Sequence, residues 1–519
     1  MRLLFGFGER ENFVSLVKIA SVVQGDGAVE EGGMHWRLPA LALLLICSLG
    51  IEVGFLVNHF HPDGPLFPFM FFFLAGFVPY LAACAIVLKT RRATGRWRWL
   101  ELGLLLVGAV LLRAMLLQVD PFLSPDSWRY LWDARITLHG YSPYIYAPQN
   151  PILTHLREAN YYKMAFHHVP TIYPPGAQLV YLISYLIAPE NLVMLKTIFL
   201  LFDIVTCAAL AYWLTRRGLD PARAIIYAWC PLPIIDFAIQ GHLDVLAITF
   251  SLLAVISSLN ESKRGRVLTG FLIGMATLAK IYPILLLVVI VRRRSSQHRD
   301  DGQLRGDAGH RLYAQGMGLL REVGYDWPLV LTCVATIVLG YLPYIVLGHG
   351  QVLGFFSTYA DEHGPNSGLV QQIMTQVYRH TGYYNVVIEH IMEAFVLGGV
   401  SLWMLILRWK ERISLEAAML ILLGTLFAVS SHIFPWYTTA LLPWIAVTVQ
   451  PVWKRGKGLN PAGLAVAMAW YFSSAILLHY FFDRLPDWTV YYVVVYDVVL
   501  LGVAVAIGVS VYRMRIERK

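Results

Sequence analysis

Long apolar runs separated by shorter polar stretches extend from residue 38 to residue 512 of the chain. A helix needs about 20 apolar residues to cross the hydrocarbon core of a bilayer, and most of these runs have that length. The pattern therefore predicts an all-α, polytopic integral membrane protein. The expected spans lie at 38–57, 66–88, 99–118, 191–214, 242–259, 327–348, 386–408, 461–481 and 489–512.

The stretches between these runs suggest how the chain is organised. We expect a polar cytoplasmic tail over 1–37 and a transmembrane domain over 38–513. Within that domain, 119–171 and 349–385 are expected to be large outer loops and 292–326 a cytoplasmic loop. The first apolar run lacks a small-residue cleavage site, so we expect a retained helix rather than a signal peptide that is removed.

Charge helps to orient the chain. The composition is 57% hydrophobic and 14% charged, with a net charge of +8. The basic residues stand in short clusters between spans, as the positive-inside rule predicts for cytoplasmic loops, so nucleic-acid binding is a poor interpretation. The chemistry is then expected to face away from the cytoplasm, across the cell (plasma) membrane. The clusters are 89–98, 215–218, 261–266, 292–299, 408–412, 452–458 and 512–519.

Two segments do not fit simple alternation across a membrane. Residues 172–214 should cross once but hold two apolar runs, and 266–291 should return to its starting side within 26 residues. Pro174, Pro175 and Pro283 interrupt these segments, and non-helical backbone at membrane depth is tolerated where it lines a protein cavity. We therefore expect half-membrane helices and a polar cavity near the outer leaflet.

Ionizable residues inside the apolar runs support such a cavity, because charges within a bilayer are costly and commonly functional. Each could instead be a structural charge with a partner. Lys196, Asp203 and Asp497 lack clustering and are expected to serve helix packing or to snorkel. Four others lie at the predicted outer ends and are grouped as one candidate site: Arg113, Asp236, Asp244 and Lys280.

The outer loop 119–171 contains the segment DPFLSPDSWRYLWDARITLHGYSPYIYAP (120–148), which is rich in acids and aromatic residues. Its apolar positions have a spacing suited to an amphipathic helix lying on the membrane. Such a helix would present Asp126, Arg129 and Asp133 on or near one polar side. The apolar positions in question are Trp128, Leu131, Trp132 and Ile136.

These residues resemble a known group, the GT-C superfamily of polyprenol-phosphate-sugar-dependent glycosyltransferases. The resemblance is strongest to glycosyltransferase family 87 and the related glycosylphosphatidylinositol mannosyltransferase I, and covers roughly residues 99–450. The segments that carry it are PDSWRYLWDARITLHGYSPYIYAP (125–148), VPTIYPPGAQLVY (169–181), CPLPIIDFAIQGHLD (230–244), LAKIYPI (278–284) and SSHIFPWYTTALLPW (430–444).

The resemblance implies a GT-C-type helical bundle that moves one sugar, often mannose, from a polyprenyl-phosphate donor to a hydroxyl of a glycolipid or glycan. It also implies that the first outer loop carries the catalytic acid. By position that acid is Asp126, with Asp120 as its competitor and Asp133 as a structural partner of Arg129 or Arg135. Several relatives have two acids one residue apart, whereas position 124 here is Ser. We therefore expect no cofactor and no metal site, although dependence on a divalent metal ion is left open.

A single acid agrees with the chemistry. An acceptor hydroxyl needs one general base, and a phosphate-linked leaving group needs no general acid. The charge that develops on the departing phosphate still needs a cation. The candidates for binding the donor phosphate are Lys280, Arg129 and His242, in that order. The structural alternatives are a charge pair of Lys280 with Asp244 or Asp236 and a helix-cap or core role for His242.

Further candidates and other functions remain open at this stage. His432 could contribute to acceptor binding or deprotonation, although single histidines of this kind are commonly structural. A transporter or flippase would show similar charges and broken helices, but it predicts internal repeats and no large outer loop. A lipid-linked transferase that moves another group, such as aminoarabinose or a phosphorylated substituent, is a second alternative.

Overall fold

The computed structural model describes residues 36–58, 66–291, 326–354, 368–430, 433–482 and 489–517. Most of the predicted tail 1–37 and loop 292–326, and part of the loop 349–385, lie outside these residues. Within the described chain, seven helices are long and apolar enough to cross a membrane, or eight if one bent pair counts as a span. The prediction of a polytopic all-α protein is confirmed.

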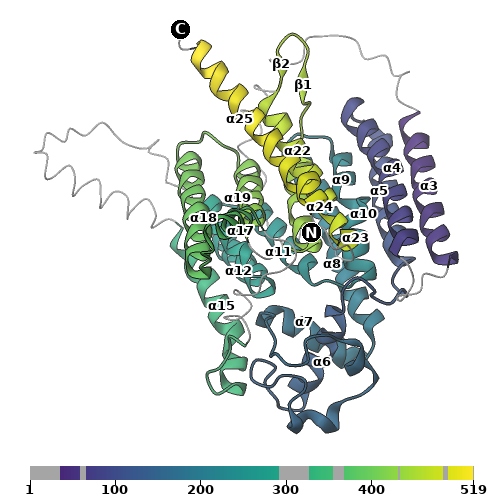
Figure 1. Ribbon diagram of the computed structural model, residues 1–519. Helices are drawn as coiled ribbons and strands as arrows, with labels where there is room; N and C mark the ends of the chain where they lie inside the picture. Colours follow the sequence, from purple (N-terminus) through teal and green to yellow (C-terminus); the bar gives the residue numbers. More distant parts are fainter. Residues whose placement is uncertain are drawn as a thin grey trace, which may run out of the picture.

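The long helices follow the predicted apolar runs closely (Figure 1). Helix α5 occupies the predicted third span, but Arg98, Glu101 and Arg113 interrupt its apolar sequence. The long helices are α3 (Arg37–Val57), α4 (Leu66–Lys89), α5 (Gly95–Ala114), α8 (Leu192–Arg216), α15 (Trp327–Leu347), α18 (Val386–Trp409), α22 (Pro461–Ala475) with η7 (Ile476–Leu478) and α23 (His479–Phe482), and α24 (Thr489–Tyr492) with η8 (Val493–Asp497) and α25 (Val498–Glu517).

Short helices stand where alternation across a membrane failed in the sequence. In 172–214, the 13-residue α7 (Pro175–Ile187) precedes α8. In 266–291, the chain leaves α12 (Lys263–Ala279) at Lys280 and turns back. The other short elements are η3 (Pro221–Ala224), α9 (Ile225–Ala228), α10 (Pro231–Pro233), the π-helix η4 (Ile234–Ile239), α11 (Asp244–Ser257), η5 (Tyr282–Leu285), α13 (Leu286–Ile290), α17 (Leu369–Thr381), α19 (Leu415–Val429), α20 (Pro435–Thr438), η6 (Thr439–Leu441) and α21 (Leu442–Thr448).

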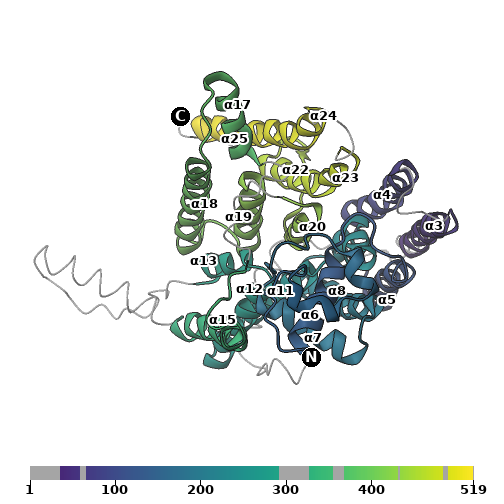
Figure 2. The ribbon, with the colours of Figure 1, turned by 60° about the horizontal axis from the view of Figure 1, so that its bottom comes forward.

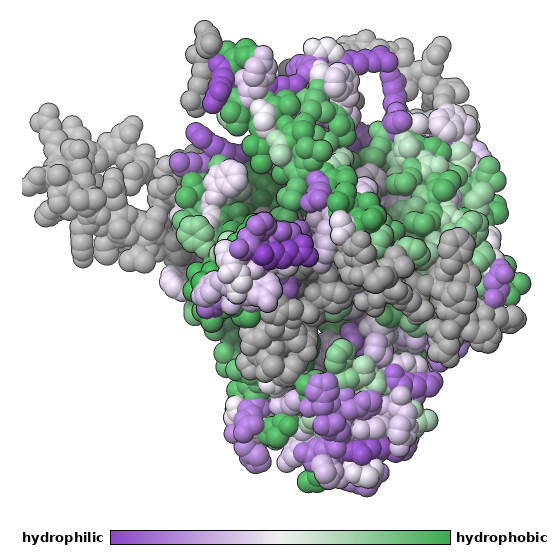
Figure 3. Space-filling model, in the orientation of Figure 1, coloured by the Kyte–Doolittle hydropathy of each residue, from purple (hydrophilic) through white to green (hydrophobic). Residues whose placement is uncertain are grey.

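The two ends of the molecule differ in character. At the lower end in Figure 1, α6 (Asp126–Leu138) and α7 pack together with the 3₁₀ helices η1 (Pro151–Leu156) and η2 (Ala159–Lys163). The opposite end carries the C-terminus of α25 and the two-residue strands β1 (Trp453–Lys454) and β2 (Gly458–Leu459). In Figure 3, hydrophobic residues dominate the helical part between the ends, and hydrophilic residues gather at the lower end.

Helix α6 differs from the amphipathic surface helix that the sequence predicted. Its residues from Ser127 to Ile136 are all buried, and Asp133 has no exposed surface. The helix packs against α7 on one side and against η2 and α8 on others, so it has no free face to lay on a bilayer. The prediction of a surface helix was wrong because tyrosine contacts bury it: the Tyr130 ring stacks on Tyr181 with centroids 4.4 Å apart.

Glycine residues allow α12 to pack closely against its neighbouring helices. A Cβ on Gly270 would stand 2.1 Å from the Leu329 carbonyl oxygen of α15, and one on Gly274 would stand 2.6 Å from Thr336. Glycines four residues apart allow this backbone approach between membrane helices. On the other side, a Cβ on Gly176 of α7 would meet Leu278 at 2.8 Å. The end of α12 is therefore held between α15 and α7 (Figure 2).

Candidate active site

Asp126 is the first residue of α6, where the partial positive charge of a helix N-terminus favours a carboxylate. Its side chain is 21% exposed. Hydrogen bonds from the side chains of Tyr173 and Ser124 reach the carboxylate. Burial raises the pKa of the Asp126 carboxyl above its ordinary value, more than the Lys280 ammonium and these two hydrogen bonds lower it. A raised pKa makes this carboxylate a better proton acceptor.

The chain just before Asp126 is fixed by one amide side chain. The Oε1 atom of Gln240 accepts hydrogen bonds from the backbone N–H groups of Phe122, Leu123 and Ser124, at 3.2, 3.0 and 3.3 Å. Gln240 stands directly after η4. The outer loop is thereby attached to the turn between η4 and α11, more than 100 residues further along the chain.

Lys196 also connects the outer loop to the end of η4. The Lys196 ammonium is buried and donates to the carbonyl oxygens of Val119 at 2.7 Å and Ile239 at 3.2 Å. The prediction that Lys196 snorkels or only packs helices missed this role. The only available signal was its place at the outer end of a span. Gly241 completes the turn with φ of +69°, a conformation that side chains rarely adopt.

This turn brings His242 beside the outer-loop acid. The Nδ1 atom of His242 lies 3.9 Å from Oδ2 of Asp126. The imidazole stacks on the indole of Trp436 in α20, with centroids 3.7 Å apart and an interplanar angle of 17°. Phe434 stacks on the other side of this group, 4.5 Å from Trp436. His242 is thus held by aromatic stacking and not by capping a helix.

Lys280 supplies the cation of the cluster. Its ammonium lies 3.4 Å from Oδ1 of Asp244, the first residue of α11, and 4.3 Å from the ring centre of Tyr437. The same ammonium interacts electrostatically with Asp126. The pair of Lys280 with Asp244, which the sequence analysis gave as the structural alternative, is therefore present. The same lysine also lies near the outer-loop acid Asp126. Four of the predicted residues, Asp126, His242, Asp244 and Lys280, therefore lie in the same part of the molecule.

Two further groups of this site were not assigned a role from the sequence. Asp236 was grouped with the charges of the candidate site and named as an alternative partner of Lys280, and Tyr480 was not considered. The carbonyl oxygen of Asp236 accepts a hydrogen bond from the backbone N–H of His242 at 2.9 Å. Tyr480 follows His479, whose ring packs edge-on against Phe434 with centroids 6.2 Å apart. Nothing in the local sequence HYFF (479–482) distinguishes this tyrosine from an interfacial aromatic residue.

The remaining predicted residues of the loop hold its shape. Asp120 is 60% exposed and pairs with Lys163 at 3.4 Å. Arg129 pairs with Asp133 at 2.8 Å and donates to the carbonyl oxygens of Phe166 and Val169. The expected partnership of Arg129 and Asp133 is present, and it leaves the Arg129 guanidinium engaged inside the loop.

The other candidates lie elsewhere or outside the described residues. Arg135 is bound by Glu158 and by Glu190 and does not reach the cluster. Arg113, which the sequence grouped with Asp236, pairs instead with Asp203 within the helical bundle. His432 lies outside the described residues. Among the described residues, no three His, Cys, Asp or Glu side chains are grouped so that they could hold a metal ion.

Comparison with known proteins gives the class of the molecule. Residues 171–300 match the model of Glycosyltransferase family 87. The matched range includes His242, Asp244 and Lys280, and it excludes Asp126. No curated protein matches the chain. A transferase is therefore favoured over the transporter alternative, and the chain is a multi-pass membrane glycosyltransferase that carries a family 87 domain over residues 171–300.

Proposed function

We propose that this protein transfers a single sugar, mannose in the first instance, from a polyprenyl phosphate to a hydroxyl of a glycolipid or glycan outside the cytoplasm. The observation that carries the proposal is the placement of one loop carboxylate, Asp126, 3.9 Å from His242 and near the Lys280–Asp244 pair, whose ammonium lowers the pKa of the Asp126 carboxyl. This arrangement contains the two charges that such a transfer requires, a base and a counter-charge for the leaving phosphate.

In the proposed reaction, Asp126 accepts the proton of the acceptor hydroxyl. The hydroxyl oxygen attacks the anomeric carbon, the bond from that carbon to the phosphate oxygen breaks, and polyprenyl phosphate leaves with the electron pair. Asp126 suits the role because it is partly exposed, and burial raises the pKa of its carboxyl. Asp120 remains the competitor, but it is a surface acid paired with Lys163.

Lys280 and His242 are the proposed groups for the donor phosphate. The Lys280 ammonium has three N–H donors and lies 3.4 Å from one oxygen of Asp244, so donors remain for a second anion. The Arg129 guanidinium already donates to Asp133 and to two carbonyl oxygens, so the proposal gives Arg129 the role of organising the loop. No divalent ion is required, since the donor has one phosphate and Lys280 supplies its counter-charge.

The depth of the cluster supports a lipid-linked donor. Helices α11 and α12 have 14 and 17 residues, so at 1.5 Å per residue they rise about 21 and 26 Å from the basic turn that joins them to Asp244 and Lys280. The hydrocarbon core is about 30 Å thick, so the cluster would lie near its far boundary. The phosphate of a polyprenyl lipid is located at such a boundary.

Basic segments gather at the other end of the molecule, which supports an extracytoplasmic site in the cell membrane. Arg217, after α8, pairs with Glu416 at the start of α19 at 2.8 Å. Arg513 of α25 donates to the carbonyl oxygens of Lys457 and Leu459 in the β1–β2 hairpin. By the positive-inside rule this end is cytoplasmic.

Cysteine labelling in intact cells tests the orientation. Thr154 in η1 and Arg455 in the β1–β2 turn are both exposed. In a Cys47→Ser background, which removes the exposed native thiol, Thr154→Cys should react with an impermeant reagent. Arg455→Cys should react only after permeabilisation. Labelling of position 455 alone in intact cells would reverse the proposed orientation.

Purified protein tests the reaction itself. It should be incubated with polyprenyl phosphates carrying mannose, glucose, galactose or aminoarabinose, each with and without an alkyl mannoside as acceptor. We expect loss of the mannosyl donor together with formation of a disaccharide glycoside. Transfer from none of these donors by wild-type protein would overturn the proposed function, and transfer of aminoarabinose alone would select the other transferase class.

A further inference from the structure

A small cavity at the basic end of the molecule, the Arg98 cavity, is lined by two arginines. It lies where the chain between α4 and α5 meets the end of α8, and its volume is about 210 Å³. Arg92 and Arg98 supply its charged groups, and none of the described residues that line it is an acid. Ala93 and Pro221 also line it and are buried, so the guanidinium groups border a hollow. The other lining residues are Thr94, Gly95, Thr215 and Leu219.

Among the described residues, most hydrogen-bond donors of these two arginines have no partner. A guanidinium has five N–H donors. Arg98 donates one to the hydroxyl oxygen of Thr215 at 3.0 Å, and Arg92 donates one to the carbonyl oxygen of Gly218 at 3.5 Å. The Nε atom of Arg98 is buried without a described partner, and neither side chain pairs with a described acid. Capping the end of α8 therefore accounts for only one donor of each arginine.

Positive charge at the start of α5 also lacks compensation. The helix begins at Gly95, and its first four residues include Arg96 and Arg98 but no acid. The side chain of Thr94, the N-cap residue, makes no capping hydrogen bond. A helix N-terminus carries a partial positive charge, which favours a nearby anion and disfavours a nearby cation. An anion in the Arg98 cavity would compensate both the helix end and the two guanidinium groups.

The Arg98 cavity lies at the level expected for lipid headgroups. Helix α4 ends at Lys89, α8 ends at Arg216, and the apolar sequence of α5 begins at Trp99. The Trp99 side chain is 69% exposed, and tryptophan is enriched at membrane–water interfaces. Three helices therefore reach the membrane boundary beside the cavity. A membrane lipid is the source of an anion at this level.

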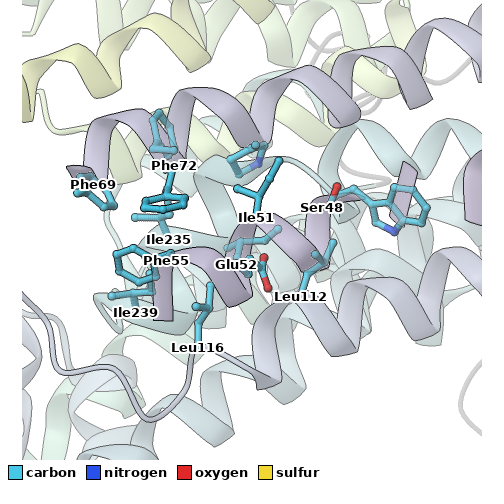
Figure 4. A pocket seen from close by; sticks show the side chains of 15 residues that line it. Ser48, Ile51, Glu52, Phe55, Phe69, Phe72, Leu112, Leu116, Ile235 and Ile239 are labelled. Atoms are coloured by element: carbon cyan, nitrogen blue, oxygen red, sulfur yellow. The ribbon is translucent and has the colours of Figure 1, made fainter. Parts of the chain in front are cut away.

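Two other cavities lack this combination of charges. Among the described residues that line the cavity between α3, α4, α5 and η4, Glu52 is the only charged one, and most of the others are apolar (Figure 4). A second cavity at the basic end is lined by Arg217 and Arg408, but also by Glu411 and Glu416. There Arg217 pairs with Glu416 at 2.8 Å. A phosphate would be repelled in the first cavity and would compete with carboxylates in the second.

We propose that the Arg98 cavity binds the phosphate group of an anionic phospholipid. Basic pockets between transmembrane helices recognise such headgroups, and a planar guanidinium can bind two phosphate oxygens at once. A zwitterionic lipid has the same phosphate but adds an ammonium group, which two arginines and a helix N-terminus would repel. The cavity lies at the opposite end of the molecule from Asp126, so this proposal does not depend on the proposed transfer.

The test compares two arginines of the same helix. Delipidated full-length protein in detergent should be titrated with phosphatidylglycerol or with phosphatidylcholine, and native mass spectrometry counts the bound lipids. Wild-type protein should bind phosphatidylglycerol more tightly than phosphatidylcholine. Arg98→Gln should bind one phosphatidylglycerol fewer at the concentration that saturates wild type, because losing charge-assisted hydrogen bonds weakens the site about 10- to 100-fold. The matched control is Arg96→Gln, an exposed position that does not line the cavity, where affinity should fall about 5-fold or less.

A second variant does not remove an arginine. Thr94→Asp places a carboxylate in the Arg98 cavity, at the N-cap position, where aspartate stabilises a helix. Thermal unfolding of the lipid-free protein should shift to a higher temperature. The variant should also fail to bind the one phosphatidylglycerol that Arg98→Gln loses, because its own carboxylate occupies the place of the phosphate.

Three outcomes would contradict the proposal. Equal loss of phosphatidylglycerol from Arg98→Gln and Arg96→Gln would reduce the effect to general surface charge. Unchanged phosphatidylglycerol binding by Thr94→Asp would place the lipid elsewhere on the protein. Inorganic phosphate is the remaining probe: if it raised the unfolding temperature of lipid-free wild-type protein and phosphatidylglycerol did not, the cavity would belong to a soluble phosphate and not to a lipid.

Discussion

The Asp203 group and the Asp126 group of buried charges differ in how their acids are bonded. In the first, both oxygens of Asp203 accept hydrogen bonds, one from Arg113 at 2.5 Å and one from Tyr227 at 2.6 Å. Arg113 also donates to the carbonyl oxygen of Ala228 at 2.6 Å. This group, the Asp203 cluster, joins α5, α8 and α9.

The second group, the Asp126 cluster, is bonded much more loosely. It contains Asp126, His242, Asp244, Lys280 and Asp236. The closest ionic contact of Asp244 is 3.4 Å, and His242 approaches Asp126 only to 3.9 Å. Both groups contain acids at membrane depth, so depth alone does not identify a functional acid. The difference is that both oxygens of Asp203 accept hydrogen bonds, whereas neither oxygen of Asp236 accepts one from the described residues.

The largest expected effect comes from removing the base of the Asp126 cluster. Asp126→Asn keeps the shape of the side chain and removes its basicity, so turnover should fall about 10²- to 10⁴-fold. Unfolding temperature and donor binding should stay close to those of wild type. The matched control is Asp120→Asn, whose exposed pair with Lys163 predicts a small change. If Asp120→Asn lost turnover and Asp126→Asn kept it, the base would be Asp120.

The Asp203 cluster should respond in the opposite way. Asp203→Asn leaves the Arg113 guanidinium buried without its counter-charge, so we expect about 3–5 kcal/mol lower stability. Thermal unfolding in one detergent measures this change. At a temperature where the variant is folded, KM for the donor should match wild type. A variant with unchanged unfolding and lost activity would remove the distinction between the two clusters.

Lys280→Met tests the cation of the Asp126 cluster. Loss of one charge-assisted hydrogen bond to phosphate predicts about a 10- to 100-fold rise in donor KM. Chelator should have no effect on the wild-type enzyme, because in the proposed reaction Lys280 supplies the counter-charge. Activity that is abolished by chelator and restored by Mg²⁺ or Mn²⁺ would contradict this role. Arg217→Met, at the basic end, is a control for the loss of a positive charge.

The smallest expected effect is a shift of the pH profile. Asp126 acts as a base only when ionised, and burial raises the pKa of its carboxyl. The fall of kcat/KM on the acid side should therefore begin at a higher pH than for an ordinary aspartate. Lys280 lowers the pKa of Asp126, so in Lys280→Met this fall should move to still higher pH. If the acid side of the pH profile were the same in Lys280→Met as in wild type, Lys280 would not influence the pKa of Asp126.

The sequence predicted helices better than it predicted partners. Apolar length locates α3 at 38–57 and α15 at 327–348 within one or two residues, because crossing a bilayer requires a fixed length. The prolines at 174 and 283 likewise indicated the short elements around α7 and α13. These features depend on local composition, which the sequence states directly.

Partner choice depends on how helices rotate and pack, which periodicity does not reveal. Arg113 was grouped with Asp236 because both lie near outer ends, but its side chain points to Asp203. Lys196 was expected to snorkel, but it joins two carbonyl oxygens beside the site. The surface placement of α6 failed for a similar reason, since its polar residues have partners from Phe166, Val169 and Gln178.

The attachment of Gln240 has a consequence for the proposed recognition of a phosphate. Three successive backbone N–H groups that converge on one oxygen form a nest, the kind of concavity that captures anions in many phosphate sites. Here the nest is filled by a neutral oxygen of the protein itself. In the proposed function, anion recognition then falls to side chains on separate helices, which single substitutions can change without rebuilding the backbone. This separation would allow related enzymes to acquire new lipid donors while keeping the loop that holds their base.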